Sequence, residues 1–170
     1  MKKSFRIVPL TLALVTACAS GSAFSAERNR SFEAGATLVG DQTLATLGYS
    51  HEIGNNIVAG GGFSFGTEAV EFEEPNDQDA WGLYANIGYK FQIAEFDIIP
   101  KVGINYLNAD VEFEDSSMAD FNLDNVYPSV GGTVNWRMIG LTVDYGKLSE
   151  TYNDQDIEED VVRVTASVNF

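Results

Sequence analysis

The stretch Val161-Val162-Arg163-Val164-Thr165-Ala166-Ser167-Val168-Asn169-Phe170 decides the fold, because its side chains alternate between two kinds. One set is apolar and consists of Val162, Val164, Ala166, Val168 and Phe170, whereas the intervening polar set consists of Arg163, Thr165, Ser167 and Asn169. A period of two is that of a β-strand, whose successive side chains point to opposite sides. The stretch therefore predicts a strand that separates an apolar environment from a polar one.

The same alternation occurs in seven earlier segments, around residues 32–39, 44–53, 57–67, 81–91, 98–106, 126–136 and 141–146. A water-soluble β-sandwich would also alternate, so the composition of the polar face decides between the two architectures. That face is rich in glycine, serine, threonine and asparagine, which suits a crowded barrel interior better than a solvated sheet. Segments of about ten residues match tilted strands that cross a bilayer. We therefore expect an all-β fold, an eight-stranded antiparallel up-and-down transmembrane β-barrel.

The connections between these segments alternate in length. Residues 54–56, 92–95 and 137–139 are short, whereas residues 68–80, 108–125 and 149–160 are long. Outer-membrane barrels combine tight periplasmic turns with longer outer loops. Residues 40–43 break the pattern, because this outer connection is short. The same strand directions predict two aromatic girdles, a periplasmic one of Phe32, Phe91, Phe96, Trp136 and Phe170 and an outer one of Phe65, Trp81 and Tyr106.

The first 25 residues have the pattern of an export signal. Lys2, Lys3 and Arg6 form a basic start, and residues 7–17 form an apolar run too short to span a membrane as a helix. We expect residues 1–25 to be a cleaved signal peptide and residues 26–170 to be the barrel domain. Residues 15–18 also resemble a lipoprotein processing box, in which Cys18, the sole cysteine, would be acylated. Cleavage after Cys18 would leave a chain without thiols, and therefore without disulfides.

The negative charge is concentrated in the three long connections. The chain has 25 acidic residues and a formal net charge of −15, and 18 of those acids lie in residues 68–80, 108–125 and 149–160, which contain no lysine or arginine. Representative members are Glu71, Glu73, Glu74, Glu112, Glu114, Asp115, Asp154, Asp156, Glu158 and Glu159. Such a surface repels nucleic acid and attracts divalent cations or a basic extracellular partner. Ordinary solvation of surface loops is the stronger explanation of these acids. No EF-hand spacing is present, so at most weak calcium or magnesium binding is expected, and no cofactor.

Two acidic segments are near copies of each other, Val70-Glu71-Phe72-Glu73-Glu74 and Val111-Glu112-Phe113-Glu114-Asp115. Both follow a membrane strand directly, so we expect them to extend those strands above the bilayer. A strand edge at this position could accept a partner strand. Simple continuation of a hairpin explains the pattern as well.

Seven charged residues are predicted to lie inside the barrel, namely Glu33, Glu52, Lys90, Asp97, Lys101, Asp144 and Arg163. Unpaired buried charges are costly, so these side chains should form one hydrogen-bonded ion-pair network. Eight strands leave an interior just wide enough for side chains. The network should therefore plug the lumen and have a mainly structural role.

The terminal alternating strand that ends on Phe170, the eight segments and the unequal connections together resemble the small outer-membrane barrels typified by the OmpA transmembrane domain and OmpX. The resemblance covers the whole of residues 26–170. It implies a monomer in the outer membrane of a Gram-negative bacterium, in contact with outer-membrane lipids and lipopolysaccharide. It also implies that Phe170 is part of the signal read by the barrel-assembly machinery.

Chemistry for catalysis is sparse in this sequence. His51 is the sole histidine, and its neighbours Ser50 and Glu52 should point to the other side of the strand. No phosphate loop, zinc cluster or nucleotide motif is present. We therefore expect a non-enzymatic barrel that contributes to envelope integrity, surface contact or adhesion. The alternatives are a narrow channel and a lipid A-modifying enzyme.

Overall fold

The computed structural model describes residues 29–40, 42–66, 75–113, 121–152 and 155–170, so the predicted signal peptide, Cys18 included, lies outside the described residues. The described chain is built from antiparallel strands: β1 (Arg30–Val39), β2 (Gln42–Gly54), β3 (Ile57–Gly66), β4 (Pro75–Tyr89), β5 (Phe91–Ile93), β6 (Phe96–Phe113), β7 (Phe121–Trp136), β8 (Ile139–Tyr152) and β9 (Gln155–Asn169). Within these residues, no helix is long and apolar enough to cross a membrane.

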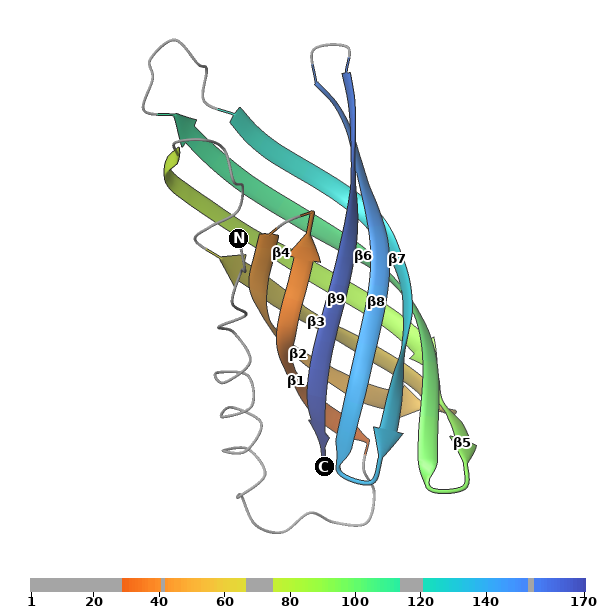
Figure 1. Cartoon of the computed structure of the whole chain (residues 1–170). Helices are drawn as coiled ribbons and strands as arrows, with labels where there is room; N and C mark the ends of the chain where they lie inside the picture. The colour runs from red at the N-terminus through yellow and green to blue at the C-terminus, as the bar shows by residue number, and fades with distance from the viewer. Residues whose placement is uncertain (1–28, 41, 67–74, 114–120, 153–154) are drawn as a thin grey trace, which may run out of the picture.

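The strands close into a barrel in up-and-down order. Apart from β4 and β5, which do not pair with each other, strands that are neighbours in sequence pair, β1 pairs with β9, and β4 pairs directly with β6. The short strand β5 continues β4 beyond Lys90 and pairs with the same strand, β6. The two therefore count as one wall strand, and the barrel has eight. The predicted fold class is confirmed, and Figure 1 shows the tilted strands wrapping around a common axis.

Tight turns join the strands at one end of the barrel. At this end, the β2–β3 connection places Asn55 and Asn56 at φ 52° and 64°, and Ala94 and Arg137 adopt φ 56° and 55° in the next two turns. Left-handed residues let a short turn match the twist of the strands that it joins. The C-terminus lies at this same end (Figure 1). We call it the periplasmic end, because short turns are characteristic of that side.

At the opposite, outer end, the strands are longer than the sequence predicted. The described parts of the expected loops at residues 68–80, 108–125 and 149–160 are strand, because β4 begins at Pro75, β6 ends at Phe113, β7 begins at Phe121 and β9 begins at Gln155. Glu112, Asp156, Glu158 and Glu159 are therefore strand residues and not loop residues, which corrects the prediction. The cause is backbone pairing, since the ladders continue to Val111–Phe121 and Tyr152–Gln155.

The extension expected at Val111–Asp115 is present as far as Phe113, whereas the corresponding Val70–Glu74 lies outside the described residues. Toward the outer end, beyond the last pair between β7 and β8, the strands continue as two protrusions whose first residues still line the lumen. The outer sheet consists of residues 75–79, 109–113 and 121–123, and the outer hairpin consists of residues 147–152 and 155–160. The ladder between β7 and β8 ends at Ser129–Gly146, next to Pro128, which has no N–H to donate.

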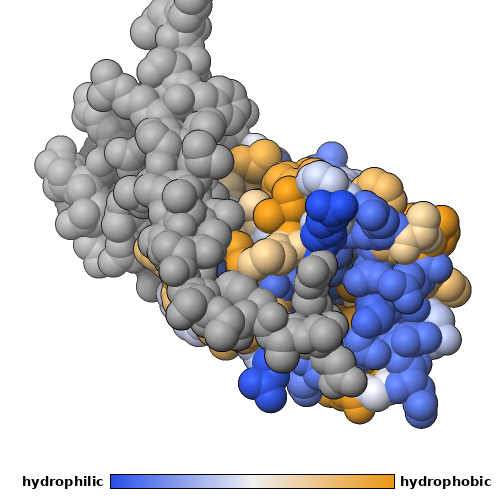
Figure 2. Space-filling model, turned by 90° about the horizontal axis from the view of Figure 1, so that it is seen from below, coloured by the Kyte–Doolittle hydropathy of each residue, from blue (hydrophilic) through white to orange (hydrophobic). Residues whose placement is uncertain are grey.

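The barrel has its apolar side chains outside and its polar side chains inside. Exposed hydrophobic residues occupy the outward positions of every wall strand, for example Leu83, Val102, Val130 and Leu141, which are 51%, 57%, 59% and 54% exposed. Both predicted girdles are present, since Phe32, Phe91, Phe96 and Trp136 are exposed near the periplasmic end and Phe65 and Trp81 near the outer end. Figure 2 views the barrel from below, at its periplasmic end, and shows hydrophilic residues gathered there with hydrophobic residues around them. Such an outside is suited to lipid.

Candidate functional site

The centre of the lumen holds a buried arginine. Arg163, on β9, donates from Nε and Nη2 to Asp144 Oδ2 over 3.0 and 2.6 Å, and from Nη1 to Asn105 Oδ1 over 3.1 Å. The two charged side chains are 6% and 5% exposed. The guanidinium group also lies 3.6 Å from the centre of the Tyr84 ring. Strands β4, β6, β8 and β9 are thus joined across the lumen through one side chain.

A second buried pair lies in the same region. Lys101 Nζ is 3.5 Å from Glu33 Oε1, and these side chains are 1% and 3% exposed. Thr165 donates to the other oxygen of Glu33 over 3.3 Å. Each of these two central charges therefore has an opposite charge beside it, as burial in a low-dielectric interior requires.

The remaining predicted lumen charges lie at the periplasmic mouth. Lys90 is paired with Glu52, and their side chains are 20% and 19% exposed. Asp97 lines a small cavity next to both, but among the described residues it forms no ion pair. The prediction of one continuous network is thus corrected, since the structure contains two buried central pairs and one partly exposed pair. The reason is depth along the barrel, because Asp97 lies at the end of β6, where water reaches it.

Small hydroxyl side chains occupy part of the remaining polar lumen. Thr37, Thr46 and Ser64 bond to one another over 2.8 to 3.1 Å, and Thr133 bonds to Thr142 over 2.6 Å. Two cavities beside the ion pairs have volumes of about 20 and 10 Å³. Each has room for about one water molecule. These hydrogen-bonded hydroxyl groups pack around the buried ion pairs.

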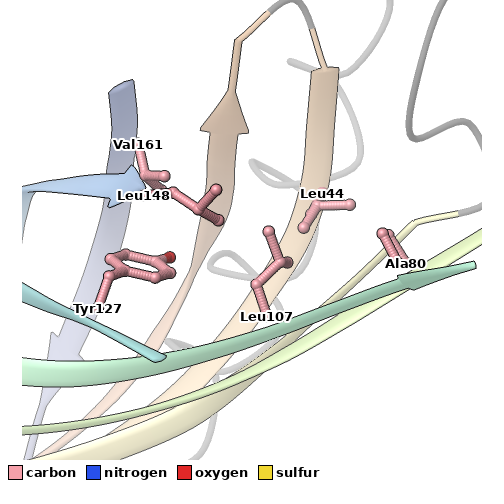
Figure 3. Packing of buried hydrophobic residues seen from close by; sticks show 7 residues of the cluster. Leu44, Ala80, Leu107, Tyr127, Leu148 and Val161 are labelled. Atoms are coloured by element: carbon pink, nitrogen blue, oxygen red, sulfur yellow. The ribbon is translucent and has the colours of Figure 1, made fainter. Parts of the chain in front are cut away.

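A layer of buried hydrophobic residues closes the outer half of the lumen. We call it the apolar cap, and it consists of Leu44, Ala80, Leu107, Ala109, Tyr127, Leu148 and Val161. Figure 3 shows its side chains projecting inward from different strands toward one another. Leu44 and Leu148 are each only 1% exposed. The sequence reading missed this layer, although the alternation could have revealed it, because Val161 precedes the outward Val162 and must point inward.

The outer hairpin carries three consecutive acids. Glu158, Glu159 and Asp160 are exposed. Lys147 pairs with Glu158, and the Tyr145 hydroxyl donates to Asp160 over 2.6 Å. Glu71, Glu73, Glu74, Glu114, Asp115 and Asp154 lie outside the described residues. Within the described ranges, no three potential ligand side chains are grouped to hold a metal ion.

A periplasmic contact joins two turns. Glu95 accepts hydrogen bonds from the Trp136 indole over 3.3 Å and from Arg137 over 3.4 Å. The hydrogen bond from Trp136, followed by the positive charge of Arg137, lowers the pKa of the Glu95 carboxyl group. The guanidinium of Arg137 also lies 5.2 Å from the Trp136 ring. The contact is exposed, so its contribution to stability is small.

His51 lies apart from the residues that could cooperate with it in catalysis. Its Nδ1 donates to the Asn29 carbonyl over 3.1 Å on the outer surface of β2. Ser50 points into the barrel, where its hydroxyl bonds to that of Ser31 over 2.5 Å. Glu52 is directed to the lumen pair with Lys90. The neighbours thus diverge in space, as the alternation predicted.

Phe170 lies at the periplasmic end of the seam between the first and last strands. Its N–H donates to the Arg30 carbonyl over 2.9 Å, and Arg30 donates back to the Phe170 carbonyl over 3.2 Å. Its ring stacks on Phe32 with centroids 5.3 Å apart. The residue therefore closes the barrel seam, and its role as an assembly signal stays a prediction.

Comparison with known proteins gives a likeness of fold. No protein-family model matches the sequence, and no curated protein matches it. Among solved structures, Neisserial surface protein A (NspA) is similar with a TM-score of 0.56 and 10% identity, covering 83% of this chain and 96% of that chain. The N-terminal β-barrel domain of Pseudomonas aeruginosa OprF is similar with a TM-score of 0.55 and 9% identity, over 85% and 98% of the two chains. The outer membrane enzyme PagL has a TM-score of 0.56 and 10% identity, over 82% and 99%.

These structures confirm the architecture that the sequence resembled, a small eight-stranded barrel of the outer-membrane type. The apolar outer surface independently places the barrel in a membrane, and closed barrels of this size are characteristic of bacterial outer membranes. The chain is therefore a barrel of the outer membrane.

Proposed function

We propose that this outer-membrane barrel is non-enzymatic and acts at the cell surface, where its acidic protrusions contribute to envelope integrity or to surface contact, including adhesion. The observation that carries the proposal is the closed lumen. Two buried ion pairs occupy its centre and the apolar cap lies above them. A barrel that is filled in this way presents its outer strands as the part available to other molecules.

The protrusions supply the chemistry for such contact. The outer hairpin raises Glu158, Glu159 and Asp160 on a paired two-stranded ladder beyond the girdle. One base, Lys147, lies among them and is already paired with Glu158. Net negative charge on a rigid ladder favours basic partners and divalent cations over anionic ones.

The alternative of a narrow channel has less support. A conducting path would have to pass Leu44, Leu107 and Leu148, three buried leucines of the apolar cap. It would also have to displace Arg163 from Asp144. Both changes are unfavourable, because ions lose hydration at an apolar constriction and a separated pair leaves two buried charges.

The alternative of an enzyme has less support from the residues that the structure describes. Although PagL shares the fold and is an enzyme, a fold does not carry its chemistry with it. Acyl chemistry needs a nucleophile within hydrogen-bond reach of a base. Here the hydroxyl of Ser50 is inside the barrel and the ring of His51 is outside it.

The proposal is tested with intact cells that express the barrel. Wild type is compared with a variant in which Glu158, Glu159 and Asp160 become Gln, Gln and Asn, and the readout is retention of cells on a surface coated with a lysine-rich peptide. We expect the wild type to be retained several-fold better. Equal retention would contradict a contact role for the outer hairpin.

A matched control removes acids from the other end of the barrel. The variant E95Q/D97N lowers the negative charge near the periplasmic turn, which intact cells do not present outside. It should be retained like wild type. Folding of each variant is checked by its migration on gels before and after heating.

A further inference from the structure

We propose that the outer face of β1, β2 and β3 binds one anionic phospholipid of the periplasmic leaflet, with Arg30 and His51 holding its headgroup. The inference rests on the placement of two basic side chains directly below an apolar hollow, and it goes beyond the surface role proposed above. The two features lie on one face of the same strands.

The hollow lies on the lipid-facing side of the barrel. Its lining includes Phe32, Ala34, Leu47, Tyr49, Gly61 and Phe63. Ala34 pairs with Leu47 and Gly61 pairs with Tyr49 across neighbouring strands, so small and large side chains lie side by side. The small residues form the floor, while Phe32, Tyr49 and Phe63, which are 54%, 39% and 46% exposed, rise around it. A furrow of this kind fits an acyl chain.

Aromatic rings mark the depth of the hollow in the bilayer. Phe32 contacts both Tyr49 and Phe170, with ring centroids 5.5 and 5.3 Å away. These rings belong to the periplasmic girdle, which lies where the hydrocarbon meets the headgroups. The hollow therefore extends from the girdle into the periplasmic leaflet.

Arg30 and His51 are the next outward-facing residues toward the periplasm. They pair with each other in the β1–β2 ladder, two positions beyond Phe32 and Tyr49. Two residues along a strand span about 7 Å. This distance places both side chains at headgroup depth, immediately below the entrance to the hollow.

The geometry of His51 favours a polar headgroup. Because a carbonyl oxygen only accepts hydrogen bonds, Nδ1 must carry the proton that it donates to Asn29. Nε2 of the neutral ring is then an acceptor for a headgroup hydroxyl. Arg30 is exposed and supplies the charge that attracts the phosphate. A phosphatidylglycerol, with one negative phosphate and a hydroxylated headgroup, matches both groups.

Charge complementarity distinguishes this occupant from others. The outer end is strongly acidic, whereas two bases stand together at this position on the periplasmic rim. A second copy of the barrel would present the same bases at the same depth, so an isologous contact through this face would bring like charges together.

The test is native mass spectrometry of the barrel released from detergent after incubation with phosphatidylglycerol or phosphatidylethanolamine of identical acyl chains. The wild type should retain one phosphatidylglycerol with about a fivefold preference, since the one cation of the site, Arg30, contributes roughly fivefold near a charged lipid. The variant R30Q/H51Q should lose this preference. The variant A34F, which fills the furrow, should retain less of either lipid.

Arg137 offers the matched control, because it is an exposed base of the periplasmic turns that does not line the hollow. R137Q should keep the preference of about fivefold. Equal retention of the two lipids by wild type, or an equal loss in R137Q and R30Q/H51Q, would overturn the proposal. A dimer in place of the bound lipid would overturn it as well. Unaltered gel migration shows that the variants are folded.

Discussion

Replacing Arg163 by methionine tests the energetic role of the central ion pair. The change removes three hydrogen bonds and leaves Asp144, whose side chain is 5% exposed, as an unpaired buried carboxylate. Breaking a buried pair on one side costs about 3 to 5 kcal/mol. With a urea slope of about 2 kcal/mol per molar, the unfolding midpoint should fall by about 2 M.

The assay is urea unfolding of the barrel in phospholipid vesicles, followed by gel migration without heating. R137M is the matched control, because its pair with Glu95 is 61% exposed on both sides and should contribute at most about 1 kcal/mol. The double variant R163M/D144N removes the stranded charge and should recover at least half of the loss. If R163M unfolds at the same midpoint as R137M, or if R163M/D144N is no more stable than R163M, the unpaired Asp144 carboxylate is not the cause of the loss.

Three further predictions concern other parts of the barrel. G48A should lower the free energy of unfolding by about 1 to 3 kcal/mol, because the new Cβ would lie 1.8 Å from the Tyr84 hydroxyl. Adding Y84F to G48A should restore part of this stability in the same urea assay. Because the pKa of Glu95 is lowered, its contact with Trp136 should persist as pH falls through the ordinary glutamate range and should disappear only as pH falls through the lowered value. Trp136 fluorescence in a W81F background measures this transition. A transition above the ordinary glutamate range would contradict the prediction. Deleting Phe170 should reduce the heat-modifiable folded fraction several-fold, because the contacts with Arg30 and Phe32 that close the seam are lost.

The wall of the barrel could be predicted from the sequence because each strand separates two unlike environments. The period of two assigns a side to every residue once Phe170 is placed outside, and Arg163, Asp144, Lys101 and Glu33 then point inward. Pairing with specific partners could not be predicted, since it depends on how far each strand is shifted along its neighbour. That shift places Asp97 at the mouth and Arg163 beside Asp144.

The outer end was harder to predict from the sequence. Clusters of acids in residues 149–160 indicated a loop, yet backbone pairing continues to Tyr152–Gln155 because water solvates the charges on either side of a two-stranded ladder. The apolar cap was missed for a related reason. Most inward positions are polar, so the alternation does not by itself show that a few inward residues, such as Leu107 and Leu148, meet as a hydrophobic layer above the charges.

Conductance across a planar lipid bilayer measures whether the lumen is closed. The purified wild-type barrel should give no steady current, because the apolar cap and the pair of Arg163 with Asp144 block the path. The variant L107S/L148S/R163S, which removes both barriers, should conduct. A steady, ion-selective current from the wild type, altered by replacing Lys101, would contradict the account and establish a channel instead.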